Sequence, residues 1–310
     1  MSKDTRIVFR NVKDFSAEQT FACGQAFRWK RGGDGSYTGV AGGRAANIAF
    51  TPADADAEGC AGDIVIRPLG VAPPAACGEG NGSDSNDRNF WENYLDLRRD
   101  YGEIKRALAA NDAVMARAVA CGAGIRILNQ EPWEALISFI LSQNNHIPRI
   151  TACVERLCAA CGTRIDGADG GVFFAFPRIE TLAGLSEGDL APCGLGYRAK
   201  YLIQTARRVA EAGGAAWLAA LRDAAIAEAE SALLSLCGVG PKVAACVLLF
   251  GLGHTEGFPV DVWMARAMRE LYGVDGKDAA AHAAERFGPY AGIAQQYLFH
   301  YMRNGRRPGE

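Results

Sequence analysis

Hydrophobic and polar residues follow two different periods along this chain. Between residues 20 and 68, short segments that alternate apolar and polar positions are separated by glycine-rich clusters, a pattern typical of antiparallel strands joined by turns. The first of these segments is 21–31. From Phe90 onward, apolar residues recur at spacings of three and four, which indicates helices that each bury one face.

This change of period predicts an α+β protein with two parts. We expect a small N-terminal antiparallel β domain over residues 1–98, with a Gly/Pro/Ser-rich loop at 71–87, and an all-helical domain over residues 99–310. The helices expected in the second part are 111–120, 131–144, 147–161, 197–214, 228–236, 241–253, 260–273 and 289–303.

Composition narrows the function classes. The 310 residues include 33 basic and 35 acidic side chains, so any surface that binds nucleic acid must be a local patch. No signal peptide or membrane-length apolar run is present, and we expect no membrane association. The ten cysteines are scattered, which favours free thiols in a reducing compartment, and a metal or redox role for the Cys158/Cys161 pair is a weak alternative. We expect no metal and no cofactor.

The most informative segment is Gly238-Val239-Gly240-Pro241, which lies between two helical patterns. Two glycines allow a tight turn with exposed N–H groups, and a helix that begins at Pro241 directs its positive end toward an anion. This arrangement binds a DNA phosphate without reading base sequence. The alternative is a plain turn between two helices.

Lys242 lies in the first turn of the helix after this hairpin, in an otherwise apolar sequence. A cation is electrostatically unfavourable at a helix N-terminus. The position therefore favours the neutral amine, which is the nucleophilic form of lysine. The alternative is a surface lysine that contacts phosphate.

Asp261, nineteen residues later, opens another helix within Pro259-Val260-Asp261-Val262. It can serve as a helix N-cap, as a carboxylate that faces developing positive charge in a cleft, or as both.

Together these motifs resemble the helix-hairpin-helix DNA glycosylases, and the whole chain resembles the 8-oxoguanine DNA glycosylase/AP lyases from about Phe21 to Arg303. The motifs that carry the resemblance are the hairpin with Lys242 and Asp261, CGQAFRW (23–29), SQNNHIPR (142–149), GLGYR (194–198) and GPYAG (288–292). At position 263 this chain has tryptophan. Animal and yeast members of the family have histidine there, whereas bacterial members often have tryptophan, so the chain resembles the bacterial members at this position.

The resemblance implies a reaction. Lys242 would attack C1′ of a damaged nucleotide, expel the base, form a Schiff base and nick the strand by β-elimination, and Asp261 would stabilise the cationic sugar and help to hold Lys242. Gly238 and Gly240 would bind DNA phosphate. The partner would be double-stranded DNA that contains 8-oxoguanine, bound by a monomer. The compartment would be the cytoplasm, associated with the nucleoid, in a bacterium and the nucleus in a eukaryote.

The resemblance also implies a pocket for the extruded base. The pairs Lys242/Cys246 and Gln295/Phe299 are each four residues apart, so each pair shares one helix face. The base would lie between Cys246 and Phe299, and Gln295 would read its Watson–Crick edge. The Gly24 carbonyl would accept from N7–H, which 8-oxoguanine has and guanine lacks. From the residues alone, core packing for Cys246 and Phe299, a solvent-facing Gln295 and a strand bulge at Gly24 remain open.

The orphan cytosine has its own expected residues, also taken from the resemblance. Asn144, Arg149 and Arg198 would receive this base, and Tyr197 would insert into the stack. Because Arg149 is present, we predict a preference for lesions opposite cytosine. Phosphate contact or solvation is the alternative for the two arginines.

Three other protein classes share some of these sequence features. Glycosylases with an iron–sulfur cluster carry four cysteines after the catalytic aspartate, whereas the last cysteine here is Cys246. A monofunctional alkylation-repair glycosylase does not need Lys242. A non-catalytic DNA-binding module would explain the two glycines but not Lys242 and Asp261 together with the pocket residues.

Overall fold

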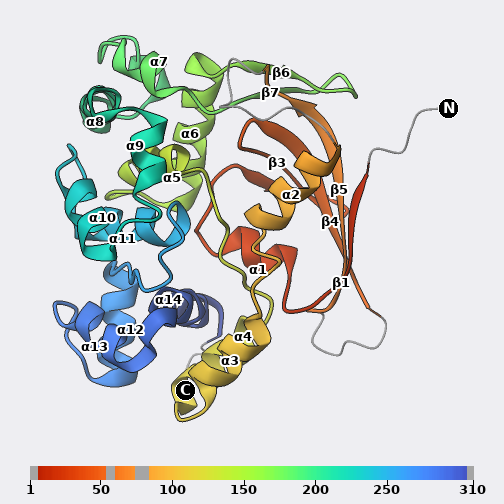
Figure 1. Ribbon diagram of the computed structural model, residues 1–310, viewed down its shortest axis with the longest axis vertical. Coiled ribbons are helices and arrows are strands. Elements are labelled where there is room, and N and C mark those ends of the chain that lie inside the picture. Colours follow the sequence, from red (N-terminus) through yellow and green to blue (C-terminus); the bar gives the residue numbers. More distant parts are fainter. Residues whose placement is uncertain (1–5, 54–59, 74–83, 306–310) are drawn as a thin grey trace.

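The computed structural model describes residues 6–53, 60–73 and 84–305. The N-terminal part is a five-stranded antiparallel sheet in the order β1-β5-β4-β3-β2, with helices packed on one face (Figure 1). Its elements are β1 (Ile7–Val12), α1 (Ala17–Ala22), β2 (Trp29–Arg31), β3 (Tyr37–Ala41), β4 (Arg44–Pro52), β5 (Gly62–Val71) and α2 (Asp84–Tyr94). The predicted α+β class is confirmed.

One face of the sheet forms a small hydrophobic core with α1 and α2. Ile48, Ile64 and Ile66 from the central strands are fully buried, and Trp91 from α2 is 1 % exposed against them. The alternation of apolar and polar residues along β4 and β5 thus gives the sheet one buried face and one more exposed face.

Two details of the N-terminal prediction are wrong. The segment 21–31, expected as a strand, begins with the end of α1 and continues through a turn, and only Trp29–Arg31 is a strand. The segment begins inside a short helix that Ser16 caps, and the buried residues of that helix do not alternate as those of a strand would. Residues 84–87 of the expected 71–87 loop belong to α2, and Val71 ends β5. Residues 74–83 lie outside the described residues.

Helices dominate the rest of the chain, and all eight predicted helical segments contain a helix. The elements in order are α3 (Tyr101–Ala109), α4 (Ala113–Cys121), α5 (Pro132–Leu141), α6 (Ile147–Cys161), β6 (Arg164–Asp166), β7 (Val172–Phe174), α7 (Ile179–Ala183), α8 (Arg198–Ala212), α9 (Ala215–Ala220), α10 (Ile226–Leu234), α11 (Pro241–Phe250), α12 (Val262–Tyr272), α13 (Ala279–Phe287) and α14 (Ala291–His300). The β6–β7 hairpin, which the helical pattern did not indicate, joins β5 through a hydrogen bond from Ala168 N to Leu69 O (2.9 Å).

The centre of the helical part is an antiparallel pair of mostly apolar helices, α5 and α11. Nearly every side chain of each is buried, as expected for a helix that is hydrophobic all round. The start of α5 lies beside the end of α11, where Pro132 is close to Gly251, and the end of α5 lies beside the start of α11. Two sequence-distant helix ends are thereby brought together in one place.

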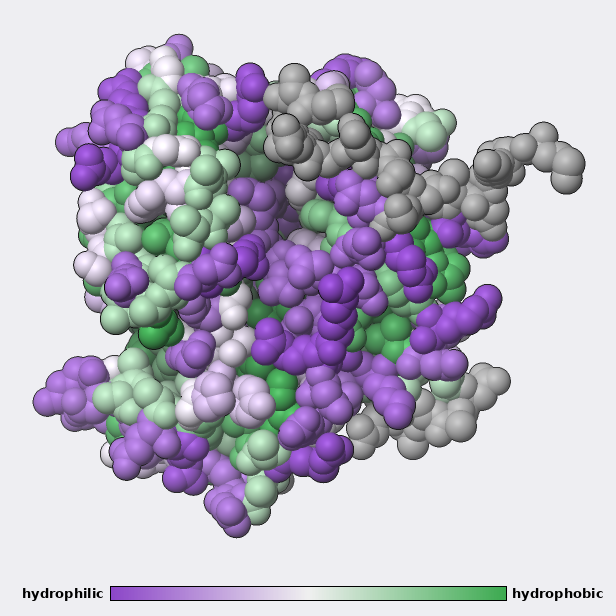
Figure 2. Space-filling view, in the orientation of Figure 1, coloured by the Kyte–Doolittle hydropathy of each residue, from purple (hydrophilic) through white to green (hydrophobic). Residues whose placement is uncertain are grey.

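Figure 2 shows that this face of the molecule is hollowed between the column of helices α7–α11 and the N-terminal sheet, with mostly hydrophilic residues visible in the hollow. No helix in the three described ranges is both long enough and apolar enough to cross a membrane. Nine cysteines are described, and all nine are free thiols.

A buried arginine joins the segments before α1 and α3 to the loop before α5. Arg126 is 3 % exposed and donates hydrogen bonds to the backbone carbonyls of Lys13, Asp14, Asp96 and Arg99. Its guanidinium also stacks on the Tyr101 ring at 4.6 Å. One side chain therefore satisfies four carbonyls from two segments that are distant in sequence.

Arg126→Met should lower the free energy of unfolding by about 3 kcal/mol or more, because several buried carbonyls lose their donors. Urea unfolding monitored by tryptophan fluorescence measures the change. Arg117→Met, at an exposed position of α4, is the matched control and should change stability by less than about 0.5 kcal/mol. Equal stability of the two variants would show that the Arg126 network contributes nothing.

Candidate active site

Six residues that the sequence analysis placed at the base and the sugar line a single pocket. The pocket measures about 50 Å³ and opens beside a groove of about 850 Å³. The predicted residues that line it are Gly24, Lys242, Cys246, Asp261, Gln295 and Phe299. They come from the turn after α1 and from α11, α12 and α14, so the fold gathers segments that span most of the chain.

Lys242 stands in the first turn of α11 but is not electrostatically isolated there. Its Nζ donates to Ser142 Oγ at 2.9 Å, and Ser142 is the C-cap of α5. The Ser142 hydroxyl in turn donates to Phe139 O at 2.7 Å, so its lone pairs face the amine. The negative C-terminal end of α5 therefore offsets the positive N-terminal end of α11 at this side chain.

An aromatic ring completes the contacts of the amine. Lys242 Nζ lies 5.2 Å from the centroid of the Phe139 ring, which is 3 % exposed. This apolar surface limits the access of water to one side of the amine, while the other side faces the pocket.

Asp261 is a helix N-cap and also lines the pocket, and its role toward a cationic sugar stays a prediction. Its Oδ1 accepts from Met264 N at 2.8 Å and caps α12, and the same residue lines both the pocket and the groove. The cap fixes the carboxylate at the mouth of the pocket without using its second oxygen in the helix. The hydrogen-bond partner of Lys242 Nζ is Ser142, and the expected contact between Asp261 and the amine stays a prediction.

Cys246 lies one helical turn after Lys242 and is 2 % exposed. Burial raises the pKa of this thiol to about 11, although the nearby Lys242 lowers it. At neutral pH Cys246 is therefore a neutral thiol, suited to apolar contact with a ring.

Gly24 closes the pocket from the N-terminal part. Its φ is +82°, and a Cβ at this position would lie 3.4 Å from Ile147 Cδ1 and 3.6 Å from Phe299 Cε1. The positive φ favours a glycine here, whereas the distances to Ile147 and Phe299 are ordinary van der Waals contacts. A turn after α1, rather than the strand bulge considered as the alternative, is the reason for this glycine.

The turn that carries Gly24 is fastened to the helical core by two buried amides. Gln25 Nε2 donates to Thr20 O and Arg126 O, and its Oε1 accepts from Leu128 N. Gln130 Nε2 donates to Gln25 O at 2.7 Å, while Gln130 N donates to Phe250 O at the end of α11. The pocket wall is thus coupled to the helix that carries Lys242.

The hairpin before α11 has the geometry expected for an anion site. Gly238 has φ +73° and lies against the Tyr201 ring, where a Cβ would approach to 2.6 Å. Gly240 is the N-cap of α11 without a side-chain capping bond, and nothing lies within 4 Å of its hypothetical Cβ. The N-terminal N–H groups of α11 are therefore free of a side-chain cap and face open space.

The four residues expected at the orphan cytosine lie close to the groove but differ in exposure. Asn144 lines the groove and has φ +46°, Arg149 is exposed in the first turn of α6, and Tyr197 is 52 % exposed. Arg198 is 4 % exposed and donates to the carbonyls of Gln143, Asn144 and Leu195. In the unbound protein Arg198 holds the loop that carries Asn144, and its contact with cytosine stays a prediction.

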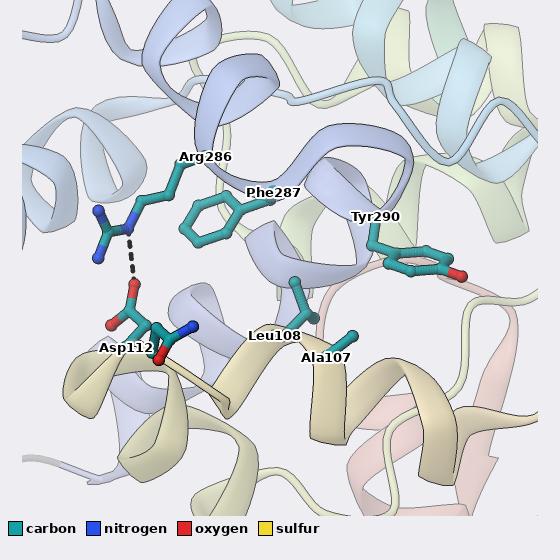
Figure 3. A pocket seen from close by; sticks show the side chains of 7 residues that line it. Ala107, Leu108, Asp112, Arg286, Phe287 and Tyr290 are labelled. Carbon is teal, nitrogen blue, oxygen red and sulfur yellow. Dashed lines mark hydrogen bonds and ion pairs between the residues drawn. The ribbon is translucent and has the colours of Figure 1, made fainter.

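A second pocket, of about 270 Å³, contains none of the predicted site residues. Figure 3 shows Arg286 pointing toward the Asp112 carboxylate, and the two atoms Nε and Oδ2 are 2.7 Å apart. Asp112 also caps α4 and accepts from Tyr272. Asp112 and Arg286 in this pocket already pair with each other, so the pocket that contains Lys242 is the better candidate for the active site.

Comparison with known proteins agrees with this geometry. Residues 7–136 match the family model "8-oxoguanine DNA glycosylase, N-terminal domain", and residues 137–289 match "HhH-GPD superfamily base excision DNA repair protein". The chain is 33 % identical over 293 residues to the N-glycosylase/DNA lyase OGG1 of Arabidopsis thaliana, which covers 90 % of this chain and 75 % of that protein. The chain belongs to the 8-oxoguanine DNA glycosylase family.

Solved structures of this family superpose on nearly the whole chain. The Clostridium acetobutylicum 8-oxoguanine glycosylase/lyase, solved with double-stranded DNA containing cytosine opposite 8-oxoguanine, has a TM-score of 0.85 at 35 % identity and covers 98 % of this chain and 97 % of its own. MBOgg1, solved with a low-affinity DNA ligand, has a TM-score of 0.86 at 36 % identity, with coverages of 99 % and 98 %. The expected family and fold are confirmed, and the chain is a base-excision repair enzyme of the N-glycosylase/DNA lyase type.

Sequence reasoning missed three residues of this site. Ser142, Gln25 and Gln296 were given no role. Ser142 belongs to the SQNNHIPR motif, and Gln25 and Gln296 directly follow Gly24 and Gln295 in the sequence. The signal in each case was adjacency to a residue already singled out. Their partners lie a hundred residues or more away or on a neighbouring side chain, so spacing alone could not reveal them.

Ser142→Ala should slow Schiff-base formation by this glycosylase at an abasic site by about 10-fold or more, because the amine loses the hydrogen bond that positions its Nζ beside the pocket. Single-turnover borohydride trapping across a range of pH measures the rate. Ser142→Thr, which keeps the hydroxyl, should restore most of it. Ser235→Ala is the matched control, since that hydroxyl also bonds the carbonyl three residues earlier but on an exposed helix end. An unchanged rate in Ser142→Ala would exclude the role.

Proposed function

We propose that this enzyme excises 8-oxoguanine, preferably opposite cytosine, from duplex DNA and then nicks the strand at the resulting site. The observation that carries the proposal is the convergence of one amine, one carboxylate, one buried thiol and one amide on a single pocket beside a long groove. An extruded base needs such an enclosed pocket, and the duplex needs the groove.

The reaction follows from the position of Lys242. The Nζ lone pair attacks C1′, the N-glycosidic bond breaks with its electron pair, and the leaving base takes up a proton. Opening of the C1′–O4′ bond then gives the Schiff base between lysine and sugar. Loss of a C2′ proton expels the 3′-phosphate, which is the β-elimination step. Asp261, at the mouth of the same pocket, stabilises positive charge on the sugar during the first step.

Recognition of the lesion is assigned to opposite sides of the pocket. The Gly24 carbonyl is proposed to accept from N7–H of 8-oxoguanine, whereas guanine would present a lone pair at that position. Gln295, 4 % exposed on α14, is proposed to read the Watson–Crick edge. The base would stack between Cys246 and Phe299.

The opposite strand is assigned to the groove. Asn144 and Arg149 are proposed to donate to the orphan cytosine, with Arg198 in support, and exposed Tyr197 is proposed to insert into the gap. Gly238 and Gly240 are proposed to hold a phosphate through the N-terminus of α11. A precedent is the solved Clostridium complex, whose DNA carries cytosine opposite the lesion.

Borohydride trapping on a set of duplexes tests the chemistry. Each duplex of about 25 base pairs carries 8-oxoguanine opposite C, A, G or T, with undamaged and uracil-containing controls. We expect a covalent adduct that is strongest opposite C, and Lys242→Gln should abolish it while sparing lesion binding. Lys30→Gln, at an exposed lysine of β2, is the control and should trap normally. Trapping by Lys242→Gln would place the nucleophile elsewhere.

Asp261→Asn isolates the charge of the carboxylate from its capping role. Asparagine caps a helix as well as aspartate does, so the start of α12 is kept. We expect single-turnover excision to slow by about 10²–10³-fold, the range found when an electrostatic stabiliser of a transition state is removed. Asp100→Asn, at the N-cap of α3, is the matched control. A near-normal rate in Asp261→Asn would reduce the residue to a cap.

A further inference from the structure

A second glutamine shares the base pocket. Gln296 follows Gln295 on α14, is 3 % exposed and lines the same pocket as Lys242 and Gly24. Neighbouring positions on a helix point about 100° apart, yet these two side chains meet, because Gln296 Nε2 donates to Gln295 Oε1 at 3.1 Å. The pocket therefore contains a pair of coupled amides.

One atom of the pair has no partner among the described residues. Gln296 Oε1 is shielded from solvent and accepts no hydrogen bond in the described part of the chain. An unsatisfied buried carbonyl is unfavourable, and such a group is uncommon in a native interior. Because the atom belongs to a residue that lines the base pocket, a donor on the bound base is the partner that its position suggests.

The direction of the bond between the amides fixes the pattern that the pair presents. Gln295 Oε1 receives one hydrogen bond from Gln296 and retains a second lone pair, and Gln295 Nε2 remains available as a donor. The pair thus offers a donor (Gln295 Nε2), an acceptor (Gln295 Oε1) and a second acceptor (Gln296 Oε1). The Watson–Crick edge of 8-oxoguanine presents O6 as an acceptor, N1–H as a donor and the 2-amino group as a donor. The two patterns are complementary, group for group.

We propose that Gln296 is a specificity-determining residue, whose Oε1 accepts from the 2-amino group of the extruded base while its Nε2 fixes the orientation of the Gln295 amide. This inference rests on the proposed function and deepens it. It restricts the substrate to oxidised purines with a 2-amino group. Because Gln296 Nε2 occupies one lone pair of Gln295 Oε1, Gln295 has one acceptor site left for two donors on the base, and Gln296 Oε1 supplies the second.

The test compares two lesions that differ only in the 2-amino group. Duplexes carry either 8-oxoguanine or 8-oxohypoxanthine opposite cytosine, and single-turnover excision is measured for each. We expect the unmodified enzyme to excise 8-oxoguanine at least about 10-fold faster, because the lesion without the amine leaves Gln296 Oε1 unpaired in the complex. Equal rates on the two lesions would overturn the inference without any variant.

Gln296→Met removes the amide while keeping the length of the side chain. This variant should lose about 10-fold or more in rate on 8-oxoguanine and much less on 8-oxohypoxanthine, so that the preference falls to about 2-fold or less. Taking the ratio between enzymes cancels any difference in how easily the two lesions leave the helix. An equal loss on both lesions would mean that Gln296 acts only through packing, and the proposal would be wrong.

Two further measurements keep the outcome decisive. Trapping at an abasic site needs no base in the pocket, so Gln296→Met should trap as well as the unmodified enzyme if its fold is intact. Where it does not, Gln296→Leu, a second replacement of similar length without an amide, replaces it and should show the same selective loss on 8-oxoguanine; an equal loss on the two lesions in that variant counts against the proposal. Failure of the unmodified enzyme to excise 8-oxoguanine at all would instead refute the proposed function.

Discussion

The antiparallel packing of α5 against α11 is the constraint on which the rest of the site depends. Both helices are buried on all sides, so neither can slide or rotate without exposing apolar surface. Their pairing sets the C-terminal end of α5 beside the N-terminal end of α11 and brings Ser142 to Lys242. Lysine is tolerated at the start of α11 because the opposing helix end and its capping hydroxyl compensate for the field of its own helix.

The N-terminal sheet takes part in the site through a single turn. Gln25 is fully buried and satisfies both ends of its amide with backbone groups of the helical part, and Gln130 connects the same turn to the end of α11. The position of Gly24 relative to Lys242 therefore depends on directional buried hydrogen bonds together with apolar packing, since Cys23 and Phe27 on either side of the glycine belong to the hydrophobic core of the helical part. A change in either glutamine would disturb the wall that faces the base while leaving the sheet and the helices intact.

The sequence predicted the fold class, the helices of the second part and the residues that meet in the pocket, because strong periodicity and short motifs encode them locally. It mistook 21–31 for a strand, since a six-residue helix is too short to show a period. From the sequence, we expected Lys242 to lie in the unfavourable electrostatic field of its own helix N-terminus. The C-terminal end of α5, which offsets this field, lies a hundred residues away in sequence and could not be foreseen. Gln296 was given no role, because only the contact between two side chains shows that the amides act as a pair.

The separation of the recognition groups has a consequence for selectivity. Guanine and 8-oxoguanine share one Watson–Crick edge, so no arrangement of Gln295 and Gln296 can distinguish the damaged base from the normal one. On the proposed function, that task belongs to the N7 side of the base, for which the Gly24 carbonyl is the proposed partner, and Gly24 lies on a different segment of the chain. The glutamine pair can only distinguish guanine-type bases from other purines. Because the two contacts touch different edges and share no side chain, their contributions to discrimination should multiply. An undamaged adenine then fails at both edges, and an undamaged guanine fails at the Gly24 edge alone, which makes guanine the hardest base for this pocket to reject.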